Sequence, residues 1–202
     1  MGRTQMQDAV PIRLGQEFKA YSVAIMRDIH RMDKAMDEMR TLNMGGTAIG
    51  TGINADEGYL RRIVPNLTEI SGMDFIQAFD LIDSTQNLDP FVAVSGAVKA
   101  CAVTLSKMSN DLRLMSSGPR TGFGEINLPA KQNGSSIMPG KVNPVIPEVV
   151  NQVAFNIIGN DVTITMAAEA GQLELNAFES DYFLLHVSVY RYSWLCSPDI
   201  GR

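Results

Sequence analysis

The fold of this 202-residue chain is decided by the stretch PFVAVSGAVKACAVTLSKMSNDLRLMS at residues 90–116. Along it, apolar residues follow one another in alternating steps of three and four, at Phe91, Val94, Val98, Cys101, Leu105, Met108, Leu112 and Met115. This spacing is that of a heptad seam on one face of a long helix. We expect the seam, with the Cys101 thiol in it, to be core, and its length requires partner helices.

Two further long helices are predicted, one on each side of this stretch. The first covers about 14–42, where apolar residues again recur every three or four positions. It ends at Asn43–Gly46, whose residues accept left-handed geometry. The second begins near Pro144 or Pro147 and reaches about Ala170. Because proline is tolerated only in the first turn, a start nearer Pro147 accommodates both prolines most easily.

The remaining segments are shorter. We predict a helix over 56–71 that ends at Gly72, an irregular stretch at 74–82, and a loop over 118–141, where Gly, Pro and Asn are dense. No run shows the sustained alternation or the hairpin turns that indicate strands. The sequence therefore predicts an all-α fold, a bundle of long, near-antiparallel helices that subunits could share.

Composition excludes several classes of function. The net charge is −5 and no basic cluster is present, which argues against a nucleic-acid partner. No apolar run matches a membrane span, and the first residues lack a signal-peptide pattern, so we expect no membrane partner and a cytoplasmic location. The two cysteines, Cys101 and Cys196, form neither a disulfide nor a metal-ligand pattern, and we predict no metal site.

The chemistry-bearing side chains concentrate in the loop GSSIMPGKVNP at residues 134–144. Ser135 and Ser136 supply hydroxyls, Lys141 a positive charge and Asn143 an amide donor. The flanking glycines allow the loop to close on a ligand and reopen. A helix N-terminus follows directly, and its free amides and positive dipole end favour a bound carboxylate.

The histidine content restricts what a serine in this loop can do. The chain has only His30, inside a predicted helix, and His186, near the end, which argues against a Ser–His–Asp hydrolase. A serine alkoxide stabilised by donors and positive charge can still remove a proton beside a carboxylate, giving an enediolate. Taken alone, the loop also fits a polar turn before a capped helix.

Four blocks carry a resemblance to a known family. The loop at 134–144 is similar to the signature of the aspartase/fumarase superfamily. Three other blocks agree in order and spacing, GRTQMQDAVP at 2–11, GGTAIGTG at 45–52 and SGPR at 117–120. The resemblance implies that residues 1–179 are a partial central helical domain of this superfamily.

Within the superfamily the chain resembles aspartate ammonia-lyases more than fumarate hydratases. The features are PVIPEVVNQ at 144–152, AEAGQLELN at 168–176, and Gln5, where fumarases and some aspartases carry histidine. Fumarate hydratase stays an alternative. A non-catalytic helical remnant is a second alternative, since the superfamily has also given rise to structural lens proteins.

The resemblance implies an anti elimination that converts L-aspartate to fumarate and ammonia through an enediolate. By matched position, Ser135 is the base that removes the proton from C3. The family uses no organic cofactor, and it forms homotetramers whose active sites draw on three subunits; its substrates are small dicarboxylates. The positions that match substrate-binding residues are Thr4, Gln5, Ser136, Lys141 and Asn143.

The chain departs from the family pattern at both ends. Family members reach the block at Gly2 only after an N-terminal domain, and the similarity stops at Ser180. We expect 180–202 to be a divergent C-terminal tail produced by a frameshift, and we expect this chain alone to be weakly active or inactive. Other charged residues are interpreted as structural ion-pair partners, namely Arg3, Asp8, Asp111, Arg113 and Arg120.

Overall fold

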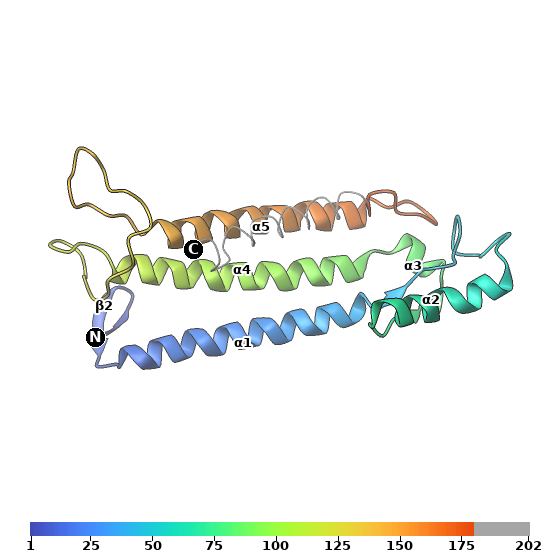
Figure 1. Ribbon diagram of the computed structural model, residues 1–202, viewed down its shortest axis with the longest axis horizontal. Coiled ribbons are helices and arrows are strands. Elements are labelled where there is room, and N and C mark those ends of the chain that lie inside the picture. The colour runs from blue at the N-terminus through green and yellow to red at the C-terminus, as the bar shows by residue number, and fades with distance from the viewer. Residues whose placement is uncertain (180–202) are drawn as a thin grey trace.

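Three long helices dominate the computed structural model, which describes residues 1–179. They are α1 (Leu14–Glu38), α4 (Asp89–Met115) and α5 (Val145–Glu169), and they run side by side with α4 in the middle (Figure 1). The predicted all-α bundle of long helices is thereby confirmed. The predicted tail at 180–202 lies outside the described residues.

The prediction that the chain forms no strands was wrong, because four short strands are present. Their lengths of two to four residues explain the error, since so few positions cannot display an alternating pattern. They form an antiparallel hairpin and a parallel pair. The strands are β1 (Gly2–Thr4), β2 (Gln7–Val10), β3 (Thr41–Leu42) and β4 (Ile76–Gln77).

One predicted helix boundary also shifts. The first helix ends at Glu38, before the predicted 42, because Thr41–Leu42 leaves it to pair with Ile76–Gln77 as β3 and β4. Helix α2 (Glu57–Ser71) matches its prediction and stops at Gly72, whose φ of 69° is left-handed. A single short turn, α3 (Asp83–Gln86), precedes α4 and was not predicted.

Small and polar side chains, not the large apolar seam, form the tight contact between α4 and α5. The buried residues of α4 include Ser95, Ala102, Ser106 and Ser109, whereas Leu105 of the predicted seam is 37% exposed. Small residues let two helix backbones approach closely. Most of the large seam residues, Cys101 included, are only half-buried, whereas Met115 is buried and Phe91 packs against a core cluster that contains Ile164 of α5.

Two buried polar contacts fix the register of α4 against α5. The Ser95 hydroxyl donates to Asp161 Oδ1 at 2.7 Å, and Lys99 forms an ion pair with the same carboxylate at 2.5 Å. Farther along, Asn151 Nδ2 donates to the backbone oxygen of Ser106 at 3.0 Å and to its hydroxyl at 2.8 Å. Because a later residue of α4 meets an earlier residue of α5, the two helices are antiparallel.

The contact between α1 and α4 carries a second polar cluster. Tyr21 donates its hydroxyl to Asp111 Oδ2 at 2.8 Å and lies 3.1 Å from Glu17 Oε1, while Lys107 pairs with Asp111. Burial, and then the hydrogen bond to Asp111, raise the pKa of Tyr21 well above its ordinary value. Burial likewise raises the pKa of the Cys101 thiol, with a further contribution from nearby Asp28.

By length and composition alone, helix α4 is long and apolar enough to cross a membrane. No membrane-spanning segment was predicted from the sequence. Helix α4 is the only such helix among the described residues. Its two flanks are in contact with α1 and α5, and its buried serines bond to polar groups of α5. Packing as the middle helix of a bundle therefore accounts for its apolar composition.

Replacing Asn151 by alanine tests the buried register contact. Asn151→Ala leaves the Ser106 hydroxyl without this donor in a buried site, so we expect the free energy of unfolding to fall by about 2 kcal/mol. Asn160→Ala is the matched control, because Asn160 bonds only Asn156 at the surface of the same helix and should cost less than about 0.5 kcal/mol. Urea unfolding of the two variants measures the difference, and equal stabilities would contradict the register role.

Candidate active site

The loop at 134–144 is closed at its base by a backbone contact. A Cβ at Gly134 would lie 2.4 Å from the carbonyl oxygen of Lys141, so only glycine fits there. Lys141 in turn donates its amide to the Met138 carbonyl at 3.1 Å, and Gly140 has a left-handed φ of 82°. The loop projects beyond one end of the bundle (Figure 1), with its two ends joined.

Within the loop, Ser135 is the more sheltered of the two serines. It is half-buried, and its Oγ accepts a hydrogen bond from the amide of Ile137 at 3.2 Å. Ser136, Lys141 and Asn143 are exposed. The backbone of Gly134 touches the backbone of Lys141. Ser135, the proposed base, directly follows Gly134 and so lies next to this contact.

Helix α5 begins at Val145, one residue after Pro144. Pro147 therefore falls in the first turn, where an amide has no partner within the helix, and the absence of its N–H costs nothing. The amide of Val145 donates to the Asn143 carbonyl at 2.9 Å, whereas the amide of Ile146 has no acceptor among the described residues. A free amide and the positive end of the helix dipole thus lie beside Asn143.

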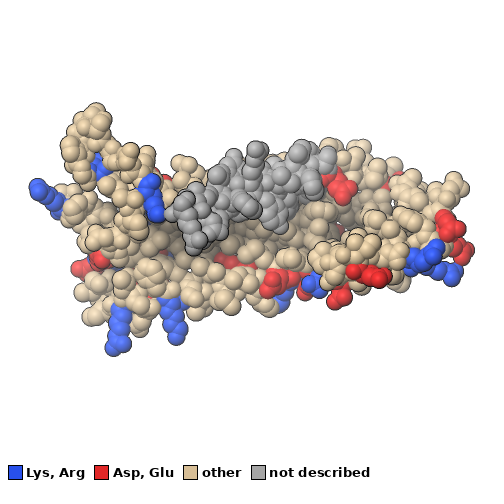
Figure 2. All heavy atoms as spheres, viewed as in Figure 1, with Lys and Arg blue, Asp and Glu red and all other residues tan. Residues whose placement is uncertain are grey.

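The segment from 117 to 143 is locally positive although the chain as a whole is acidic. It contains three cations, Arg120, Lys131 and Lys141, none of which forms an ion pair within residues 1–179. Its single acidic residue, Glu125, is paired with Arg3. Figure 2 shows Lys and Arg side chains with few acidic ones at this end of the molecule. A dianionic ligand is favoured here.

Thr4 and Gln5 lie in the β1–β2 hairpin at the same end of the bundle (Figure 1). Gln5 and Met6 form its two-residue turn with φ of 52° and 66°, a conformation that non-glycine residues adopt only under strain. No hydrogen bond joins Thr4 or Gln5 to the loop within residues 1–179. The structure therefore gathers all six predicted site residues at one end but does not bring the hairpin pair into contact with the loop.

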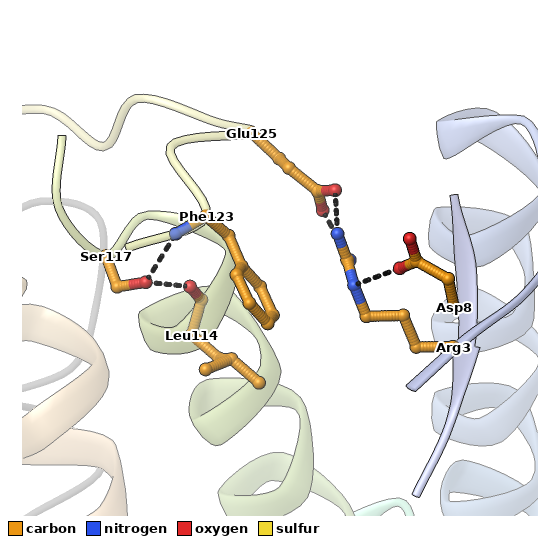
Figure 3. A network of polar contacts seen from close by, with 6 residues as sticks. All are labelled: Arg3, Asp8, Leu114, Ser117, Phe123 and Glu125. Carbon is orange, nitrogen blue, oxygen red and sulfur yellow. Dashed lines mark hydrogen bonds and ion pairs between the residues drawn. The ribbon is translucent and has the colours of Figure 1, made fainter. Parts of the chain in front are cut away.

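Sequence reasoning missed Glu125, the acidic partner of Arg3 (Figure 3). The Arg3 guanidinium donates to both carboxylate oxygens of Glu125, at 2.6 and 3.1 Å, and stacks 4.1 Å from the ring centroid of Phe123. The hydrogen bond from Arg3 lowers the pKa of Glu125. The only signal in the sequence was that no other acidic residue occurs between 112 and 147.

The other predicted ion-pair residues have mixed outcomes. Asp8 lies 3.5 Å from Arg3, and Asp111 pairs with Lys107. Arg113 lies 3.7 Å from Glu148. Arg120 forms no ion pair in the described part of the chain. Of these pairs, Arg113–Glu148 joins α4 to α5 and Asp111–Lys107 lies within α4, and none involves a predicted substrate-binding residue.

A cavity of about 780 Å³ lies at the opposite end of the bundle. Its lining includes Asp80, Asp83 and Asp89, and none of the predicted site residues. Carboxylates of like charge would repel a dicarboxylate, so this cavity does not suit the predicted substrate. Residues 1–179 contain no group of three or more His, Cys, Asp or Glu side chains that could hold a metal ion.

Known proteins agree with the resemblance. The chain is 58% identical to the aspartate ammonia-lyase of Bacillus subtilis strain 168 over 179 residues, which are 89% of this chain and 38% of that protein. For the aspartate ammonia-lyase of Pseudomonas fluorescens the identity is 61% over 180 residues, with the same shares covered. The chain therefore spans less than two fifths of the length of these relatives.

Solved structures match the fold. A structure named fumarate lyase:delta crystallin from Brucella melitensis, bound to cobalt, superposes with a TM-score of 0.91 at 53% identity, over 95% of this chain and 42% of that one. A class II fumarase from Schistosoma mansoni gives the same TM-score at 34% identity, over 95% of this chain and 43% of its own. A family model described as Lyase matches residues 1–159. The chain therefore belongs to the lyase family, in which aspartate ammonia-lyases are 55–61% identical to it over 179–180 aligned residues.

Proposed function

We propose that this chain supplies the catalytic loop of an aspartate ammonia-lyase, which converts L-aspartate to fumarate and ammonia. The observation that carries the proposal is the closed loop, in which the Gly134–Lys141 contact holds Ser135 next to a lysine. A helix N-terminus adjoins the loop, in a segment with three cations that form no ion pair within residues 1–179. The proteins called aspartate ammonia-lyase, 55–61% identical to this chain, support the choice of substrate.

The proposed reaction removes a proton from C3 of aspartate and then expels ammonia from C2. The Ser135 alkoxide takes a proton from C3 of aspartate, and the electron pair of that C–H bond moves into the adjacent carboxylate to give an enediolate. The pair then returns to form the C2–C3 double bond. On the opposite face, the C2–N bond breaks, and nitrogen leaves with its bonding electrons as ammonia. Fumarate remains, and the serine gives up its proton before the next turnover.

The residues that would hold the enediolate follow from its charge. Proton removal turns one carboxylate into a dianion, so the groups that matter most are those whose attraction grows with that charge. Lys141 supplies a full positive charge, while Asn143 and the free Ile146 amide supply donors. Ser136, Thr4 and Gln5 are assigned to binding the substrate in its ground state.

Two alternatives compete with this function. Fumarate hydratase would place water where ammonia leaves, and the Schistosoma mansoni fumarase supports that alternative at only 34% identity. A non-catalytic helical remnant would keep the bundle without binding a ligand, but the presence of Ser135, Lys141 and Asn143 argues against it. Comparing fumarate formation from aspartate with that from malate separates the two activities, and failure to bind any dicarboxylate would favour the remnant.

We also propose that the chain assembles as a homotetramer. Large apolar side chains on the outer faces of the long helices support this, because they stay exposed in a single chain. Examples are Phe18, Met26, Ile29 and Met36 on α1, and Ile146, Phe155, Val162 and Met166 on α5.

The exposed face of α5 provides the test of assembly. Sedimentation should give four times the 22.1 kDa of one chain, and Phe155→Glu should reduce that mass because the ring is 64% exposed on α5. Ile70→Glu is the control, since Ile70 is 84% exposed at the end of α2 and should leave the mass unchanged. A monomer mass for the unmodified chain would refute the tetramer.

Two loop variants test the proposed function. Because weak turnover is expected from this chain alone, fumarate binding by calorimetry accompanies the ammonia-release assay. Ser135→Ala should lower kcat by about 100-fold or more with binding retained, since it removes only the base. Lys141→Ala should weaken fumarate binding by about 10-fold or more through the lost charge. Ser22→Ala, an exposed serine on α1, is the control. Normal turnover in Ser135→Ala would exclude the serine as base.

Two glycine variants test whether the closed base of the loop matters. Gly134→Ala drives a methyl group into the Lys141 carbonyl, so the loop must open, and kcat/KM should fall by about 100-fold. Gly96→Ala, inside α4 with open space around it, should leave binding and turnover unchanged and raise the free energy of unfolding by about 1 kcal/mol. Equal activity in the two variants would show that the Gly134 contact is irrelevant to the site.

A further inference from the structure

The turn that carries Gln5 is strained and needs support from outside itself. Gln5 and Met6 both have left-handed φ values, where hairpin turns ordinarily place Asn or Gly. Such residues persist only where the surrounding structure over-determines them. The four residues of β2 are all exposed, so the hairpin has little core of its own.

The support comes from Arg3, which lies next to Thr4 on β1. Its guanidinium makes a two-pronged contact with Glu125 and covers the Phe123 ring (Figure 3). Asp8 on β2 lies 3.5 Å from its Nε, so the same side chain holds both strands of the hairpin. We name this group of four residues the hairpin clamp.

The partners of Arg3 are themselves anchored to the end of α4. The Phe123 amide donates to Ser117 Oγ at 3.1 Å, and that hydroxyl donates to the Leu114 carbonyl at 2.6 Å. The Glu125 amide donates to the Met115 carbonyl at 2.8 Å. The clamp thus ties the hairpin to the rigid middle helix through segment 117–125, the same segment that leads into the catalytic loop.

We infer that Arg3 and Glu125 are positioning residues, which orient the Thr4–Gln5 turn for dicarboxylate binding through the hairpin clamp. The inference rests on the proposed function. Arg3 does not itself bind substrate, because its charge is already neutralised by Glu125 and its plane is stacked on Phe123. Side chains alternate along a strand, so fixing Arg3 on one face of β1 fixes the direction of Thr4 on the other.

The test measures hairpin amide exchange and fumarate binding in the full 202-residue chain. Arg3→Ala should speed exchange of the hairpin amides, leave the long helices protected, and weaken fumarate binding by about 10-fold or more. Glu125→Gln, which keeps the size of the side chain, should act in the same direction. Arg3→Glu combined with Glu125→Arg and Asp8→Lys restores opposite charges at all three ionic positions of the clamp and should recover at least part of the lost binding.

An exposed ion pair on α2 provides the matched control. Arg61→Ala breaks an exposed Arg–Glu pair of similar length on α2, at 3.0 Å from Glu57, and should change neither measurement. Unchanged fumarate binding in Arg3→Ala, or a loss that the charge swap does not recover, overturns the inference. If the unmodified chain binds no fumarate, the proposed function is refuted, and the inference about substrate positioning falls with it. This outcome is distinguishable because it is measured before any residue is replaced.

Discussion

The structure depends on the close, polar contact between α4 and α5. The Ser95–Asp161 and Ser106–Asn151 hydrogen bonds fix how far one helix slides along the other. The segment 116–144, which contains the loop at 134–144, joins the end of α4 to the start of α5, so this register also sets the distance between its two attachment points. Buried polar pairs are well suited to this task, because a slip of one turn would leave each of them unsatisfied.

A second constraint is the distribution of charge. The chain carries a net charge of −5, yet the segment that bears the loop has its single carboxylate neutralised by Arg3. Acidic side chains line the cavity at the other end of the bundle, and they repel anions there. The uneven charge therefore favours anions at one end of a long molecule without a large basic patch.

The sequence predicted the bundle well because helical periodicity is local and repeats many times along each long helix. It also singled out Ser135, Lys141 and Asn143 as candidates, since all three lie in one short loop. It could not predict the Arg3–Glu125 pair, whose members are 122 positions apart, or the left-handed backbone at Gln5 and Met6, where residue type argues for other geometry. The heptad seam was identified correctly as a pattern, but which face of α4 is most buried depends on the approach distance of α5, which spacing does not encode.

The contact between Gly134 and Lys141 has a consequence for the entropy of ligand binding. With the base already closed, the two ends of residues 135–140 are held together before any ligand binds. Fixing a residue costs roughly 1–2 kcal/mol, so a loop left open from 126 to 143 would lose far more conformational freedom on binding. A glycine without any functional group thus contributes to affinity by shortening the part of the chain that has to become rigid.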